Sequence, residues 1–154
     1  MISYDIESFE DIYEEIKSMC FSHAEETEDY SDFMPLDPNF DLYFSMSEAG
    51  TLSFCTARDE KGKLVGYFSM IIDYHPHHKS ILCCTNNLLY VSKEYRNSGV
   101  AKEMMLLCEE YLKEKKVQLF IFSAKSSNPL QSLAKDLGFD SCEVSYSKFI
   151  KGDI

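Results

Sequence analysis

Four histidines are the side chains of this sequence best suited to moving a proton at neutral pH. Three of them lie in the segment His75-Pro76-His77-His78, and the fourth is His23. An imidazole titrates near pH ~6.5, so it can take a proton from an amine under ordinary conditions. We therefore take His75, His77 and His23 as candidate general bases; the alternative for each is a solvated loop histidine. The His-x-His-His pattern has no carboxylate or cysteine partners at ligand spacing, so we predict no metal site.

A second segment, Arg96-Asn97-Ser98-Gly99-Val100-Ala101, is suited to holding a phosphate. It lies between an apolar stretch that ends at Val91 and an amphipathic stretch at 100–116, which predicts a strand, a tight turn and a helix. The first turn of a helix presents backbone N–H groups that have no helical acceptor, and the helix dipole adds positive potential there. Gly99 lets a ligand approach because it has no Cβ, and Ser98 is expected to cap the helix.

This six-residue segment resembles the Arg/Gln-x-x-Gly-x-Gly/Ala signature of the GNAT superfamily of N-acetyltransferases. Asn128 and Leu137-Gly138-Phe139 are similar to later parts of that family. A His-rich turn and a histidine after the first helix are similar to features of some small bacteriophage members. The resemblance implies a GNAT-like acyltransferase fold, in which the central strand splays from the next one, and acetyl-CoA as the co-substrate.

The resemblance also implies roles for individual residues. The backbone of Leu89, Tyr90 and Val91 would bond the pantetheine arm, and Asn128 would lie near the arm or the thiol. The pyrophosphate would be held by the amides of the turn, which comprise Arg96, Asn97, Ser98, Gly99, Val100, Ala101 and Lys102.

Two positions depart from the family pattern. Many members place a carboxylate on the central strand, where this sequence has Asn86 and Asn87, and many place a tyrosine where it has Ala134. Histidine is then the expected base, with Tyr90 or Asp73 as the next candidates. We expect an enzyme that moves an acetyl group to a primary amine of a small molecule or protein. The alternative is a non-catalytic domain of the same fold that binds coenzyme A or a protein partner.

The remaining segments are the elements that must position these residues. Hydrophobic periodicity predicts strands at 2–6, 51–58, 64–74, 80–91, 117–123 and 143–149. It predicts helices at 8–21, 38–49, 100–116 and 129–137, with Asp37 as the cap of the second helix and a loop at 22–37. Gly66 indicates a bulge or a close backbone contact. This order predicts an α+β fold with a mixed central sheet and helices on both faces.

Composition narrows the class of protein further. A length of 154 residues suits one domain, taken as 1–154. The net charge of −11 argues against a nucleic-acid surface; it suits a cationic or amine acceptor, or simply solubility. Six cysteines without a Cys-x-x-Cys pair indicate a reduced, cytoplasmic protein, and no apolar run of ~18 residues predicts a membrane span. GNAT domains often form dimers, and the tyrosine-containing final strand would serve as an edge in a homodimer.

Overall fold

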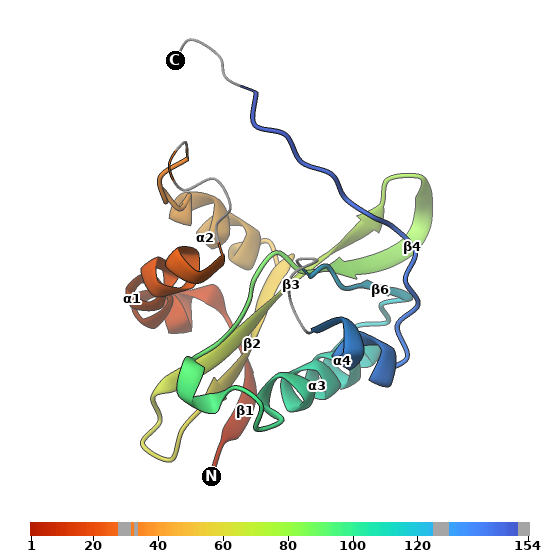
Figure 1. Cartoon of the computed structure of the whole chain (residues 1–154). Helices are drawn as coiled ribbons and strands as arrows, with labels where there is room; N and C mark the ends of the chain where they lie inside the picture. Colours follow the sequence, from red (N-terminus) through yellow and green to blue (C-terminus); the bar gives the residue numbers. More distant parts are fainter. Residues whose placement is uncertain (28–31, 33, 125–129, 151–154) are drawn as a thin grey trace.

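The computed structural model describes residues 1–27, 32, 34–124 and 130–150 (Figure 1). In chain order its elements are β1 Ser3–Glu7, α1 Phe9–Thr27, α2 Phe40–Glu48, β2 Leu52–Arg58, β3 Leu64–His75, β4 His78–Thr85, β5 Leu89–Val91, a 3₁₀ turn Lys93–Tyr95, α3 Val100–Glu114, β6 Leu119–Ile121 and α4 Leu130–Asp136. The strands form one mixed sheet with helices on both faces, so the predicted fold class is confirmed.

Strand β3 organises the sheet, because its 12 residues pair with β2 on one side and with both β4 and β5 on the other. The strand order is β1-β2-β3-β4-β6, and β5 also pairs with β3. The β4–β6 pair is parallel and the other pairs are antiparallel. Residues 71–75 of β3 face β4, and residues 66–68 face β5. Strands β4 and β5 therefore lie end to end along the same side of β3.

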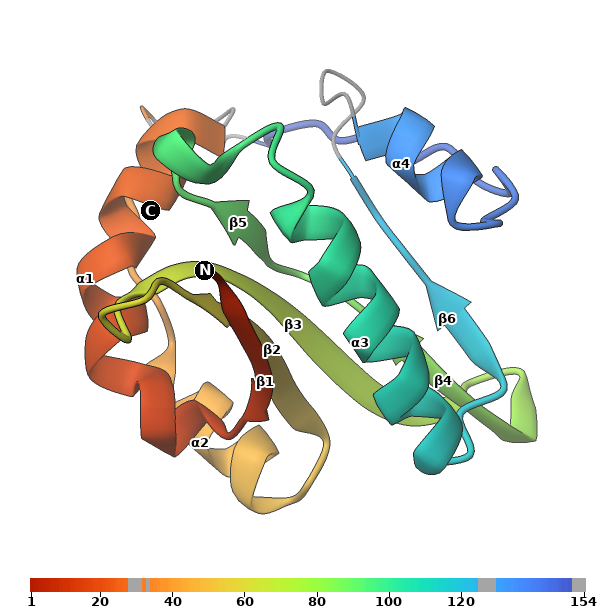
Figure 2. The same cartoon turned by 90° about the horizontal axis from the view of Figure 1, so that it is seen from below.

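Each face of the sheet has its own apolar core. Phe54 and Tyr67 pack with Phe9 of α1 and the apolar side of α2, whereas Cys55 and Phe68 pack under α3. Adjacent residues go to opposite cores because side chains alternate along a strand. Figures 1 and 2 accordingly show α3 and α4 on one side of the sheet and α1 and α2 on the other.

Gly66 is the point where α3 and β5 approach β3 most tightly. A Cβ at Gly66 would lie 3.2 Å from the carbonyl oxygen of Tyr90 and 3.4 Å from Cε of Met104. The predicted close backbone contact is confirmed, and the register shift of the neighbouring ladder lies between Ala57 and Arg58. A larger residue would push the two elements apart, so this glycine sets how closely α3 covers the sheet.

The first helix is longer than predicted and the second begins later. We expected a loop from 22 to 37, but α1 continues through Thr27. Ala24 and Glu25 have high helix propensity, and the carboxylate of Glu26 is held 2.5 Å from Nη2 of Arg96. The cap of α2 is Asn39, whose Oδ1 accepts a hydrogen bond from the Leu42 N–H at 3.1 Å, and the expectation of Asp37 was wrong.

Two strand predictions were also wrong. The single strand expected at 80–91 is divided into β4 and β5, because the chain leaves the ladder at 86–88. The strand expected at 143–149 does not form, and Val144 and Tyr146 are 73% and 93% exposed. Alternating apolar and polar residues give a segment two different faces, but a strand also needs a neighbouring strand for its backbone hydrogen bonds. Among the described residues, β6 pairs with β4 alone. The other boundaries agree to within about two residues.

Candidate active site

The break between β4 and β5 is held by the hydroxyl of Ser69, which is fully buried in β3. Its Oγ accepts hydrogen bonds from the N–H groups of Asn87 at 3.3 Å and Leu88 at 2.9 Å, and donates to Oδ1 of Asn87 at 2.6 Å. Asn87 Nδ2 in turn donates to the hydroxyl of Tyr43 on α2 at 3.3 Å. The irregular backbone therefore has its polar groups satisfied, and the break is a built feature of the sheet.

Replacing Ser69 by alanine should lower the free energy of unfolding by about 1 kcal/mol, since the N–H groups of Asn87 and Leu88 lose the buried hydroxyl that accepts their hydrogen bonds. Denaturant unfolding measures the change. Ser45→Ala, on the exposed side of α2, is the matched control and should change stability by less than about 0.5 kcal/mol. Equal stability of the Ser69 and Ser45 variants would contradict this role of the hydroxyl.

Beyond the end of β4, the chain that leads into β5 separates from the chain that follows β6. The last parallel pair is Thr85 with Ile121. The amide of Asn86 then bridges to the backbone of Ser123: Nδ2 donates to its carbonyl oxygen at 3.1 Å, and Oδ1 accepts from its N–H at 2.8 Å. A side-chain amide thus replaces a peptide group at the point where the two strands splay. Asn86 fixes where the gap between them begins.

The edge of β5 that faces this gap carries peptide groups that do not pair with β3. The Leu88 carbonyl accepts from the Ser69 N–H, and the Ser92 N–H donates to the Val65 carbonyl, both across the β3–β5 ladder. Peptide groups alternate in direction along an antiparallel strand. Those of Tyr90 therefore face β3, as residues 88 and 92 do. Those of Leu89 and Val91 face the gap.

The turn after β5 leads into the N-terminus of α3. Gly99 is the residue before the helix and has φ of +87°, and Asn97 has φ of +60°. The first helical hydrogen bond runs from the Glu103 N–H to the Gly99 carbonyl at 3.0 Å. The amides of Val100, Ala101 and Lys102 consequently have no acceptor within the helix. A Cβ built on Gly99 meets no atom within 4 Å, so the approach to these amides is open.

Ser98 does not cap α3, and that prediction was wrong. Its Oγ donates to the carbonyl oxygen of Tyr95 at 2.5 Å, while Gly99 occupies the cap position without a side-chain hydrogen bond. The hydroxyl stabilises the turn. The helix amides are thereby left for a ligand, and the helix dipole makes their position favourable for an anion.

The side chain of Arg96 turns away from these amides and joins the turn to α1. Its Nε donates to the Val91 carbonyl at 2.7 Å, its Nη2 lies 2.5 Å from Oε2 of Glu26, and its guanidinium lies over the ring of Tyr90, 5.5 Å from the centroid. The hydrogen bond from Arg96 holds the pKa of the Glu26 carboxyl below its usual value. Arg96 therefore connects the turn after β5 to the end of α1.

Replacing Arg96 by alanine should loosen the last turn of α1 and lower affinity for coenzyme A by about tenfold, because one cation near the turn is lost while the backbone amides remain. Calorimetry measures the affinity, and amide exchange over residues 20–27 measures the loosening. Lys93→Ala is the matched control, since Lys93 lies 3.7 Å from Glu26 but is 70% exposed, and it should change both quantities little. Equal effects of the two variants would contradict a special role for Arg96.

A cavity of about 400 Å³ opens at the same gap, between α1, the segment leading into α2, and the divergence of the strands. His23 lines it, with Nδ1 2.6 Å from the Tyr67 hydroxyl and the ring stacked on Tyr90 at 4.9 Å. Burial raises the pKa of both tyrosines, which keeps them protonated as phenols. The Tyr90 hydroxyl donates to Oε1 of Glu26 at 3.2 Å. His23 is thus a titratable ring held in the cavity wall by two phenols.

The structure brings only part of the predicted histidine set to this cavity. His23 and Tyr90 are in contact, but His75 and His77 lie in the hairpin between β3 and β4 with ring centroids 5.8 Å apart. His75 is eight positions from Tyr67 along β3, which at about 3.3 Å per residue is roughly 26 Å. The hairpin is also far from α1 in both views (Figures 1 and 2). Asn128 lies outside the described residues.

Sequence reasoning missed Tyr67, Glu26 and Ser69. Tyr67 and Ser69 lie inside an apolar strand, where a hydroxyl gives no signal of its partner. Glu26 lies in an acidic segment that we expected to be a loop. The adjacent Asn86 and Asn87 at the end of a strand were the available sign of a break, since asparagine is depleted within strands.

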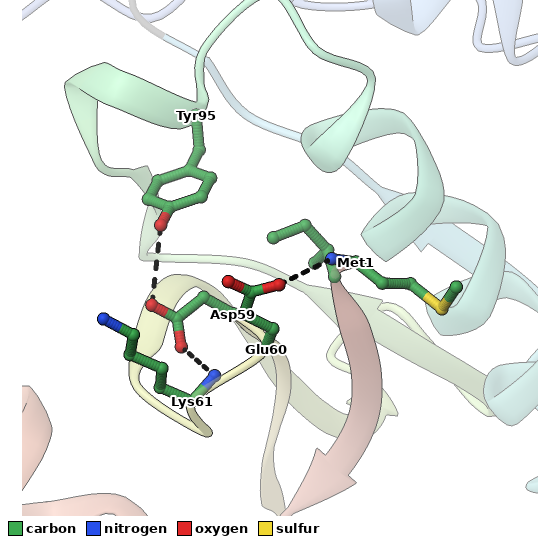
Figure 3. A pocket seen from close by; sticks show the side chains of 6 residues that line it. Met1, Asp59, Glu60, Lys61 and Tyr95 are labelled. Atoms are coloured by element: carbon green, nitrogen blue, oxygen red, sulfur yellow. Dashed lines mark hydrogen bonds and ion pairs between the residues drawn. The ribbon is translucent and has the colours of Figure 1, made fainter.

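A second hollow, of about 350 Å³, lies near the N-terminus (Figure 3). In it the Tyr95 hydroxyl reaches Oδ2 of Asp59 at 3.5 Å, and the Met1 amino group lies 3.8 Å from Oε2 of Glu60. These polar groups contact one another, and Glu60 is 74% exposed at the surface. No histidine is among the described residues that line this hollow, and it does not open at the strand gap, so the candidate active site is the cavity beside His23.

The described part of the chain has neither a membrane-spanning helix nor a cluster of metal ligands. No helix in that part of the chain is long and apolar enough to cross a membrane. No three of its His, Cys, Asp or Glu side chains are grouped so that they could hold a metal ion.

The splayed strands, the open helix N-terminus and the cavity beside them are the arrangement expected of an acetyltransferase. The chain belongs to the GNAT family of acetyltransferases, since the model of that family, described as "Acetyltransferase (GNAT) family", matches residues 7–139. The predicted resemblance is confirmed. Among curated protein sequences none matches this chain.

Solved structures with the same fold include three acetyltransferases. One is a ribosomal-protein-alanine N-acetyltransferase from Brucella melitensis biovar Abortus 2308 (TM-score 0.70, 16% identity, covering 98% of this chain and 100% of that one). Another is an aminoglycoside acetyltransferase from an uncultured soil metagenomic sample (TM-score 0.75, 15% identity, 98% and 99%). The third is described as a predicted acetyltransferase, from Clostridium acetobutylicum, and was solved with acetyl-CoA (TM-score 0.70, 14% identity, 97% and 96%). At these identities the likeness is one of fold.

Proposed function

We propose that this chain, taken as one domain over residues 1–154, is an N-acetyltransferase that uses acetyl-CoA and acts on a primary amine of a small molecule or protein. The proposal is supported by the gap that opens between the chain that follows β4 and the chain that follows β6. The open edge of β5 and the open amides of α3 border it on one side, and the cavity containing His23 opens at it on the other.

The residues present fit acetyl-CoA. The N–H and C=O groups of Leu89 and Val91 suit the two amides of a pantetheine arm, although the Val91 carbonyl also accepts from Arg96. The amides of Val100, Ala101 and Lys102 suit the pyrophosphate, and the open space at Gly99 allows it to approach. When bound, acetyl-CoA supplies an acetyl thioester at the gap.

The chain's own residues would prepare the amine. In the tautomer whose Nδ1–H donates to the Tyr67 hydroxyl, Nε2 of His23 is the nitrogen that accepts a proton, and we assign it the role of general base. Tyr67 and Tyr90 hold the ring, and Glu26 in turn holds the Tyr90 hydroxyl. The Leu89 N–H faces the gap and is the donor best placed for an oxygen that gains charge.

Incubating the protein with acetyl-CoA and a panel of amines, and measuring the free thiol of coenzyme A, tests the proposal. Amine-dependent thiol release with a matching acetylated product is the expected result. The alternative is a non-catalytic domain that binds coenzyme A or a protein partner, and the absence of a family-type carboxylate at Asn86 and Asn87 and of a tyrosine at Ala134 favours it. Coenzyme binding without turnover of any amine would select that alternative.

Acetyl-CoA should raise the melting temperature of the protein. A ligand present at 100 times its dissociation constant adds about 2.7 kcal/mol of stability by mass action, because it binds only the folded state. Differential scanning fluorimetry with acetyl-CoA, and with ATP or NAD as controls, measures this. No rise with millimolar acetyl-CoA, or an equal rise with all three ligands, would contradict a dedicated coenzyme site.

A further inference from the structure

The cavity beside His23 has one polar wall and one apolar wall. Hydroxyl and amide groups from the sheet side form the first wall, among them Tyr67, Asn86 and Asn87. The second wall comes from α1 and the chain around the start of α2, and its apolar part includes Ile16, Met34, Leu36 and Phe40. Met34 and Leu36 are 49% and 37% exposed, so the apolar wall continues to the rim. The polar wall lies next to the strand gap, where the amine must react.

The described residues that line the cavity carry little charge to match a polycation. Asp37 is the single carboxylate among the described lining residues, it lies exposed at the rim, and no described lysine or arginine lines the space. Placing an ammonium group in a site without a partner is costly, because its hydration is lost. One amine is neutralised by losing its proton to His23, but each further amine would need its own partner.

The size of the cavity sets a second limit. At ~30 Å³ per water-sized group, about 400 Å³ holds on the order of 13 non-hydrogen atoms. The acetyl end of the co-substrate takes up part of that space at the strand gap. The acceptor that remains enclosed is therefore small, and its body contacts the apolar wall.

We propose that the acceptor is a small monoamine with an apolar or aromatic body, bound with its amine at the polar wall and its body against Ile16, Leu36 and Phe40. This inference rests on the proposed acetyltransferase function. It assigns the substrate class by the chemistry of the walls, and it places specificity in the segment that precedes α2. The overall charge of −11 draws cations toward the protein, but the cavity itself selects against a second charge.

Phenethylamine and spermidine test this directly, since they have about the same number of non-hydrogen atoms but differ in charge. Kanamycin represents a larger polycation, and a peptide with a hydrophobic N-terminal residue represents a protein acceptor. The full chain should acetylate phenethylamine with a kcat/KM on the order of 100-fold above that of spermidine. Calorimetry in the presence of coenzyme A should show phenethylamine binding. Preference for spermidine, kanamycin or the peptide would overturn the substrate class.

If the proposal is correct, one substitution should change the preference of the enzyme for phenethylamine over spermidine. Leu36→Glu should lower kcat/KM for phenethylamine by about tenfold and raise it for spermidine, by adding a carboxylate to the apolar wall. Leu42→Glu on α2, where the side chain is 52% exposed and does not line the cavity, is the matched control and should leave the ratio unchanged.

The outcomes separate this inference from the proposed function. If phenethylamine is neither bound nor acetylated, the proposed substrate class is overturned, whatever the other amines do. Turnover of another amine in that case leaves the acetyltransferase function standing. No turnover of any amine and no rise in melting temperature with coenzyme A overturns both.

Discussion

Replacing Gly99 by glutamate should lower the affinity for coenzyme A by on the order of 1,000-fold and leave the protein folded. The new carboxylate would stand at the N-terminus of α3, beside the amides of Val100, Ala101 and Lys102. Two like charges about 4 Å apart repel by about 4 kcal/mol at an effective dielectric constant of 20, which corresponds to roughly three powers of ten in affinity. No atom lies within 4 Å of a Cβ at this position, so the side chain itself causes no clash.

The backbone cost of the same change needs its own control. Gly99 has φ of +87°, which an L-residue adopts at a cost of about 1–2 kcal/mol. Gly99→Ala carries that cost without the charge and should bind coenzyme A within about tenfold of the wild type. Calorimetry gives both affinities, and circular dichroism with thermal melting shows whether the variants are folded. Equal affinity of the alanine and glutamate variants would show that the pyrophosphate binds elsewhere.

Replacing His23 by glutamine should lower kcat by about 10²–10⁴-fold, the usual cost of losing a general base. Glutamine can still form a hydrogen bond with Tyr67, but it cannot take a proton from the amine. Affinity for coenzyme A should not change, because His23 lies in the cavity wall and the phosphate amides belong to α3. Steady-state kinetics on an amine found by the thiol assay measures kcat, with the exposed hairpin residue His78→Gln as the matched control.

The pH dependence gives an independent check on His23. A base that is already protonated cannot take a proton from the amine, so turnover should fall at low pH, and the glutamine variant should lose that dependence. Losses confined to His75→Gln or His77→Gln would place the base in the β3–β4 hairpin. Normal turnover in all three variants would leave Tyr90 or Asp73 as candidates.

The features of this molecule that could be predicted from sequence are those that depend on residues close together in the chain. The turn from Arg96 to Ala101 gives both a helix start and a glycine with positive φ, and both are present in the structure. The alternation of apolar residues indicated β2 and β3 and the two cores they separate.

The contacts that complete the site join residues far apart in the sequence, and no local pattern predicts them. His23 and Tyr67 are 44 positions apart, and Arg96 and Glu26 are 70 apart. The support for the break at Asn86 and Asn87 was similarly hidden, because it comes from Ser69 on β3 and from Ser123 in the chain after β6. The alternating pattern at 143–149 likewise does not show whether a neighbouring strand is available for pairing, and the strand predicted there was wrong.

The buried cysteines under α3 have a consequence for a protein that handles a thioester. Burial raises the pKa of Cys84 to about 12, and a hydrogen bond with Cys55 together with burial raises that of Cys108. Cys20 lines the cavity itself, and burial raises its pKa as well. Exchange between a thiol and a thioester requires the thiolate. These three sulfur atoms are therefore poor competitors for an acyl group, so an acyl donor bound at the proposed site would be kept for the acceptor that enters the cavity.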